Sequence, residues 1–249
     1  MILRRFAEAL QAQNWTSIWI EFVLLIAGVF LGIQVANWNE QRQLEVHRSA
    51  ALARLHAESE AAIAYIDSRI AIMAGDAELR TEALRRLSDN DWQGADPARM
   101  AKALDTLQFA PAVAPPRAVY DELISTGLYS EVGDPRLREA VSAYIAQIGW
   151  VERQIDYVRA RLVARNEGRV FAGERPVFDP AGYRQTRRAY DLPALSADPA
   201  FVANAILNNE TTIAQVEWTR GLLDKAKAMC SEISRIDGQP CKAPVENAP

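Results

Sequence analysis

The sequence predicts an all-α protein in which a single N-terminal transmembrane helix runs into a soluble bundle of long helices with coiled-coil-like seams. Three observations predict this class. An apolar run lies close to the N-terminus, apolar residues recur every three or four positions over long later segments, and no useful stretch alternates with period two. We therefore divide the chain into a short N-terminal cytoplasmic segment (1–17), a transmembrane helix (18–38), a helical bundle domain (39–236) and a C-terminal tail (237–249).

Residues 18–38 have the length and composition of a membrane span. As a helix, 21 residues rise ~31 Å, which matches a hydrocarbon core of about 30 Å. Trp15 and Trp19 mark one end and Trp38 the other, as in an aromatic belt. The competing interpretation is a cleaved signal peptide with residues 22–33 as its apolar core. Because bulky residues stand where a small-x-small cleavage site would follow, we favour an uncleaved anchor.

Small residues form one stripe on the predicted span. Gly28, Gly32 and Ala36 recur every four residues, and Glu21 lies on the same helical face. Such a stripe lets two helices approach closely, so these four residues are candidates for transmembrane self-association and a homodimer. The alternatives are that glycine is common in membrane helices and that Glu21 extends to the interface beside Trp19.

Two motifs resemble those of a family of uncharacterised bacterial proteins, which have one N-terminal transmembrane helix followed by a helical domain. The first motif combines Glu21, Gly28, Gln34 and the run Asn37-Trp38-Asn39-Glu40. Gly32 departs from it, since the family pattern has alanine there. The second motif is a helix followed by glycine, carried by Tyr120, Leu123, Ser125, Thr126 and Gly127. The resemblance implies an architecture and no activity.

Charge and cysteines predict the compartment. Arg4 and Arg5 precede the span and Arg42 and Arg48 follow it, which slightly favours a cytoplasmic N-terminus. Cys230 and Cys241 flank a turn-forming Gly-Gln-Pro run and could close a disulfide, which requires an oxidising compartment. They could equally be two unrelated thiols. We expect a bacterial inner-membrane protein with a periplasmic C-terminal domain.

Apolar periodicity predicts three long helices in the bundle domain. The first carries a stripe from Leu52 to Met73 and ends at Gly75, before a shorter helix over 77–87. The last covers 200–236, with inward residues predicted at Ile206, Ile213, Val216, Leu223, Cys230 and Ile233. Between them, a heptad seam is formed by Leu137, Val141, Tyr144, Ile148, Val151, Ile155, Val158 and Leu162.

Local signals place the shorter elements. Asp-Pro pairs predict helix starts at Asp96, Asp134, Asp179 and Asp198, because Asp caps free N–H groups and Pro lacks one. A helix over 117–126 should end at Gly127. The proline-rich run 111–116 predicts a stiff connector over the surface. The Gly-, Pro- and Arg-rich stretch 166–197 is interpreted as a solvated loop, with anion binding as the alternative.

No motif predicts enzymatic activity, a cofactor or a metal site. His47 and His56 are nine residues apart and are expected at the surface. Glu58 and Glu60 are expected on solvated faces. A net charge of −4 gives no reason to expect nucleic acid binding. A Cys-His pair would require folding to bring Cys230 or Cys241 to a histidine.

The function predicted from the sequence is that of a membrane-anchored envelope interaction or scaffold module. Its expected partners are the lipid bilayer, a second copy and an unidentified envelope protein. The alternative is a periplasmic sensory or ligand-binding module that signals through a partner membrane protein, because only about 17 residues precede the span.

Overall fold

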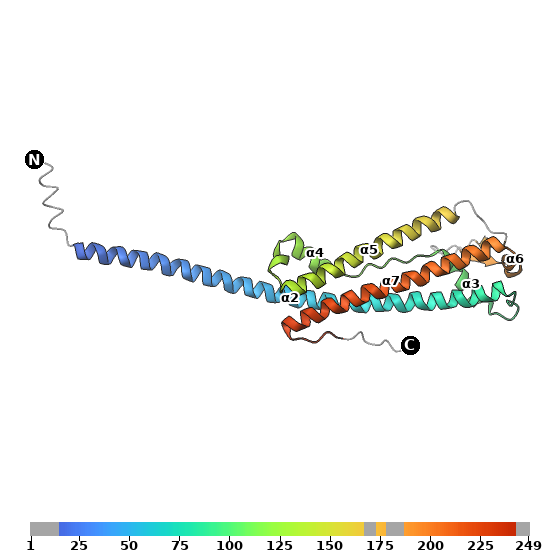
Figure 1. The fold of residues 1–249 in the computed structure, drawn as a ribbon, viewed down its shortest axis with the longest axis horizontal. Helices are drawn as coiled ribbons and strands as arrows, with labels where there is room; N and C mark the ends of the chain where they lie inside the picture. The colour runs from blue at the N-terminus through green and yellow to red at the C-terminus, as the bar shows by residue number, and fades with distance from the viewer. Residues whose placement is uncertain (1–14, 167–172, 178–186, 243–249) are drawn as a thin grey trace, which may run out of the picture. The chain divides into compact units, whose positions relative to one another are not determined.

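A computed structural model describes residues 15–166, 173–177 and 187–242. Within these ranges the regular structure is helical except for one short two-stranded ribbon (Figure 1), which confirms the predicted all-α class. The chain divides into two compact units, Met1–Ala50 and Ala51–Pro249. The second unit contains the bundle and its core.

Helix α2 (Trp15–Ser88) is a single 74-residue helix. It confirms that the apolar segment continues without a break into the bundle domain. The predicted end at Gly75 is wrong, because Met73 and Ala77 on either side are buried in the bundle and their packing outweighs the ~1 kcal/mol helix penalty of glycine. Helix α2 ends at Ser88, one residue beyond the end predicted for the helix over 77–87, and Asn90 follows in the left-handed conformation at φ 55°.

The other two long helices are α5 (Pro135–Asn166) and α7 (Pro199–Asp237), which pack side by side (Figure 1). All eight residues of the predicted seam on α5 are buried. The predicted stripe of α2 is buried too, from Leu52 to Met73, with Ile70 partly so. It therefore packs within its own bundle.

Helix α7 differs from its predicted inward face. Ile206 and Ile213 are 39% and 46% exposed, so these two assignments are wrong. The interior positions are instead taken by polar residues, namely Asn208, Asn209, Thr212, Gln215 and Thr219. An apolar pattern alone does not reveal such a face. Three of these side chains are paired with distant segments, namely Asn209 with Thr81, Thr212 with Arg80 and Gln215 with Pro111.

One of those segments is the connector over 109–117, which lies in the bundle and not over its surface as predicted. Pro111, Val113 and Pro115 are buried in alternation with exposed neighbours. Each long helix makes one hydrogen bond to this connector. On α7, Gln215 Nε2 donates to the carbonyl of Pro111 (2.8 Å), and on α5, Arg159 Nε donates to that of Ala110 (3.0 Å). On α2, Tyr65 Oη accepts the N–H of Ala114 (3.2 Å).

A second polar contact of α7 involves Arg80 on α2, which is 1% exposed. Its Nη1 donates to Thr212 Oγ1 at 2.5 Å and its Nε to Thr106 Oγ1 at 2.9 Å. Burial lowers the pKa of Arg80, an effect that the nearby Asp76 opposes. Thr106 begins the short 3-10 turn η1 (Thr106–Gln108), which follows α3 (Pro97–Asp105).

Three of the four Asp-Pro starts are confirmed. Asp96 and Asp198 cap α3 and α7, and Asp134 Oδ1 accepts from the N–H of Leu137 (3.0 Å) at the start of α5. The fourth, Asp179, lies outside the described residues. Asp191 caps α6 (Leu192–Ser196), a helix that we did not predict.

Helix α4 (Ala118–Ser125) matches the predicted helix and is followed by Gly127 at φ 74°, then by the 3-10 turn η2 (Leu128–Glu131). Glu58 of α2 accepts the N–H groups of Val119 (2.6 Å) and Tyr120 (3.3 Å) at its start. Glu60 accepts the N–H of Lys242 (2.8 Å). Both glutamates are half-buried, so the prediction of solvated faces was wrong for them.

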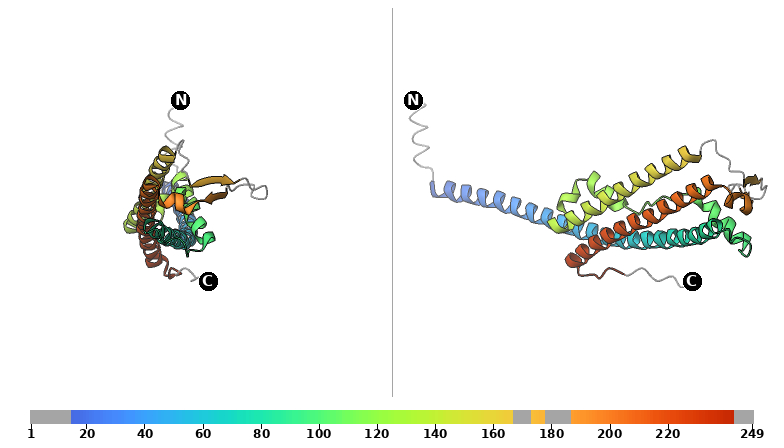
Figure 2. Two further views of the ribbon diagram at one scale, coloured as in Figure 1. Left: turned by 90° about the vertical axis from the view of Figure 1, so that its right-hand side faces the viewer. Right: turned by 45° about the vertical axis from the view of Figure 1, so that its right-hand side comes forward.

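The stretch 166–197 is not only loop. Strands β1 (Glu174–Val177) and β2 (Arg187–Tyr190) pair antiparallel, with Glu174 opposite Tyr190 (Figure 2). Of the arginines in this stretch, Arg169 and Arg184 lie outside the described residues, whereas Arg175, Arg187 and Arg188 lie on the two strands.

Candidate functional site

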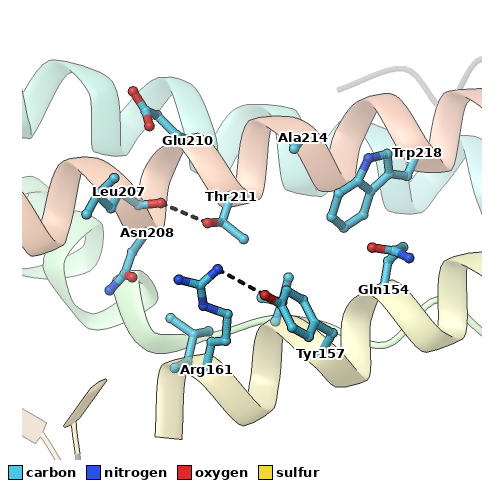
Figure 3. A pocket seen from close by; sticks show the side chains of 11 residues that line it. Gln154, Tyr157, Arg161, Leu207, Asn208, Glu210, Thr211, Ala214 and Trp218 are labelled. Carbon is cyan, nitrogen blue, oxygen red and sulfur yellow. Dashed lines mark hydrogen bonds between the residues drawn. The ribbon is translucent and has the colours of Figure 1, made fainter. Parts of the chain in front are cut away.

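A cleft with a volume of about 460 Å³ lies between α5 and α7 (Figure 3). Its base is apolar, because Val158 and Leu162 of α5 are buried. Its walls combine aromatic, aliphatic and polar side chains: Gln154, Tyr157, Arg161, Leu207, Asn208, Glu210, Thr211, Ala214 and Trp218.

Arg161 is the cation of the cleft. Its Nη1 donates to Tyr157 Oη at 3.1 Å, and its guanidinium carbon lies 5.5 Å from the centre of the Tyr157 ring. Both residues point into the cleft from α5, opposite Asn208 and Thr211 of α7 (Figure 3). An exposed guanidinium beside a ring has N–H groups free to hold a carboxylate or phosphate.

Trp218 forms the other end of the cleft. It packs edge-to-face on Trp150, with ring centres 5.7 Å apart, and is half-buried. An apolar wall at one end and a guanidinium at the other suit a small amphipathic anion. Sequence reasoning missed this cleft, since its residues come from two helices more than forty positions apart.

A second cluster gathers around the two cysteines. Cys230 on α7 and Cys241 beyond its end are joined in a disulfide, with Cα atoms 6.1 Å apart. A ring nitrogen of His56 and the two sulfurs lie within 4.8 Å of one another. His56 is 6% exposed, so its predicted surface position is wrong, and folding does bring it to the cysteines.

Asp237 holds the imidazole of His56. Its Oδ2 lies 2.6 Å from His56 Nδ1, and its Oδ1 accepts the N–H of Gln239 at 2.9 Å. Burial raises the pKa of Asp237, but these hydrogen bonds lower it by more, so the pKa lies below its usual value. Sequence could have flagged His56, because it lies three and four residues from Ser59 and Leu52 on the buried stripe.

The predicted self-association residues all lie on the first unit. Glu21, Gly28, Gly32 and Ala36 are exposed on α2. A Cβ added at Gly28 or Gly32 meets nothing within 4 Å. The stripe is therefore open along the helix of a single chain.

The fold and these sites define a helical-bundle protein with one N-terminal helix that is long and apolar enough to cross a membrane. An 18-residue window of that helix has a mean hydropathy of 2.1. No protein-family model, curated protein or solved structure matches the chain.

Proposed function

We propose that the chain is a single-pass inner-membrane protein of bacteria whose helical bundle faces the periplasm and acts as an envelope interaction or scaffold module. The membrane anchor is inferred from the exposure of the apolar part of α2. None of its most apolar window is buried, and residues on opposite sides of the helix, such as Leu24 (67% exposed) and Ile26 (50%), both face outward. A helix that is apolar all round is typical of a membrane span.

The disulfide supports the periplasmic side, because such bonds persist in oxidising compartments. Alkaline phosphatase fused after Pro249 should be active, and a green fluorescent protein fusion at the same place should be dark. Mass spectrometry of the non-reduced protein from cells should find Cys230 linked to Cys241. The opposite fusion pattern, or two freely alkylated cysteines, would contradict this placement.

The α5–α7 face supports the interaction role. Apolar side chains that a soluble bundle would bury are exposed along it, among them Leu207 (46%) and Tyr157 (57%). A photo-cross-linking residue at Leu207 should capture one envelope protein reproducibly. The same residue at the exposed Lys227, further along α7, is the control. Equal labelling at both sites would contradict a specific surface.

The cleft favours a second candidate, a sensory or ligand-binding module that signals through a partner membrane protein. Its guanidinium and aromatic walls suit a small amphipathic anion. Native mass spectrometry of the full chain in detergent should then show a bound small molecule that is lost in Arg161→Gln and retained in Arg153→Gln, whose side chain lies outside the cleft. A ligand-free wild type that still captures a protein partner favours the scaffold role.

A further inference from the structure

We propose that the Cys230–Cys241 disulfide and a zinc ion are alternative occupants of one site, and that the reduced protein binds one Zn²⁺ through Cys230, Cys241 and His56. Two thiolates and an imidazole are preferred zinc ligands. The three donor atoms already lie within 4.8 Å of one another. This inference concerns metal chemistry and stands apart from the proposed scaffold role.

The histidine is prepared for metal binding. Its Nδ1 is engaged by Asp237 at 2.6 Å, which leaves Nε2 as the nitrogen available to an ion. Nε2 is buried and has no hydrogen-bond partner among the described residues. A carboxylate that fixes one ring nitrogen while the other faces outward to an ion is the usual support of a zinc-bound histidine. A buried ring nitrogen without a partner otherwise costs free energy.

The two sulfurs can reach a common ion. Tetrahedral zinc sites place their ligand atoms roughly 3.3–3.8 Å apart, given Zn–S bonds of about 2.3 Å and Zn–N bonds of about 2.0 Å. Cys230 and His56 are held on helices α7 and α2, whereas Cys241 follows Gly238, which ends α7 at φ 75°. The non-helical segment of Cys241 can therefore shift once the bond between the sulfurs is opened.

The site also has an entry path, bordered by Glu60 and by Lys242, whose Nζ lies 3.7 Å from Glu60 Oε2. A cavity of about 290 Å³ is lined by His56, Glu60, Asp237 and the segment that carries Cys241. Glu60 Oε1 lies 3.6 Å from His56 Nε2, so a carboxylate borders the position that the ion would take. Water entering through this cavity can complete the fourth coordination position.

The conversion balances with a dithiol reductant, or with a phosphine, which takes the oxygen of water to become the phosphine oxide while the two protons go to the sulfurs. Thiol–disulfide exchange with a dithiol breaks the Cys230–Cys241 bond, forms the disulfide of the reductant and leaves two protein thiols. Zn²⁺ then binds both sulfurs and displaces their two protons. A disulfide oxidant reverses the exchange: it is reduced to two thiols, the Cys230–Cys241 bond re-forms and the ion is released.

The full-length protein in detergent tests this proposal after reduction by a metal-free phosphine. Competition with a chromogenic chelator should give one Zn²⁺ per reduced chain and none per oxidised chain. Co²⁺ used as a probe should show the thiolate-to-cobalt charge-transfer band in the reduced protein only. His56→Gln should weaken Zn²⁺ binding because it removes the imidazole ligand. Asp237→Asn should weaken Zn²⁺ binding by about 10- to 100-fold, because it removes the support of that ligand.

The matched control is His47→Gln, because His47 is the only other histidine and is exposed. It should bind as wild type, and circular dichroism should show each variant folded. Three results would overturn the proposal: a reduced wild type that binds no zinc, cobalt bound without the thiolate band, or His56→Gln binding as tightly as His47→Gln. Loss of the helical signal on reduction without zinc uptake would overturn it too.

Discussion

Gln215 on α7 donates its Nε2 hydrogen to the carbonyl oxygen of Pro111 at 2.8 Å, deep in the bundle. The two residues are 104 positions apart, and Gln215 is 1% exposed. This bond lets a connector without regular structure pass through the core, because the carbonyl of Pro111 would otherwise lose its water without replacement.

Gln215→Leu should therefore destabilise the bundle by about 1–3 kcal/mol, since it leaves a buried carbonyl unpaired. Urea denaturation followed by circular dichroism measures the loss. Gln154→Leu on α5, which is half-exposed in the cleft, is the control and should change stability little. Equal effects of the two substitutions would mean that the bond to Pro111 contributes nothing specific.

Glu58→Ala should destabilise the protein by about 0.5–2 kcal/mol, as expected for a lost helix cap. Glu58 accepts the first N–H groups of α4, and Arg117, which precedes that helix, provides no side-chain cap. Glu78→Ala removes an exposed glutamate of the same helix and should have a much smaller effect. The free energy of unfolding, measured for both variants, tests whether Glu58 stabilises the protein as a cap of α4.

Tyr144→Phe should leave the stability unchanged or raise it. The hydroxyl of Tyr144 is buried without a hydrogen-bond partner among the described residues, and burial raises its pKa. Tyr129→Phe is the contrasting variant, because its hydroxyl donates to the carbonyl of Arg138 at 2.8 Å. Tyr129→Phe should therefore lower the free energy of unfolding by about 0.5–1.5 kcal/mol, because this hydrogen bond is lost. A Tyr144→Phe variant that is the less stable of the two would contradict the described packing.

The contribution of Asp134 should depend on pH. The N–H of Leu137 and the side chain of Arg235 hold the pKa of Asp134 below its usual value of 3.8. Its contribution is therefore fully present above pH 3.8 and is lost as the pH falls through the lower native pKa. Asp134→Asn should be less stable than wild type at neutral pH, with a difference that shrinks below that value. A stability difference between Asp134→Asn and wild type that stays constant down to acidic pH would show that the charge of the carboxylate does not contribute to stability.

Gly28→Leu and Gly32→Leu should abolish self-association of the membrane helix, while Leu25→Ile on the same face should do little. A Cβ at either glycine meets nothing within one chain, so the helix itself tolerates the change. Loss of signal in a bacterial two-hybrid assay on the isolated span would thus report on contact between two copies. Wild-type signal in both glycine variants would exclude the stripe as an interface.

The sequence by itself determined the helical class and most helix ends. The seam from Leu137 to Leu162 has an unbroken heptad spacing, and every one of its residues is buried. Asp-Pro pairs and Gly127 were equally reliable, because capping is a local property of adjacent residues. The apolar segment of α2 was readable for the same reason, since its length and composition lie within one stretch of chain.

Only the tertiary structure decided which polar residues are buried. Thr212 and Gln215 look like surface residues in the sequence, yet they are buried because Arg80 and the connector supply their partners. The place of His56 on the buried stripe of α2 was readable from the sequence, but its partner Asp237, 181 positions away, was not. A polar side chain is buried only where a partner meets it, and such partners come from distant parts of the chain, so no local pattern reveals them.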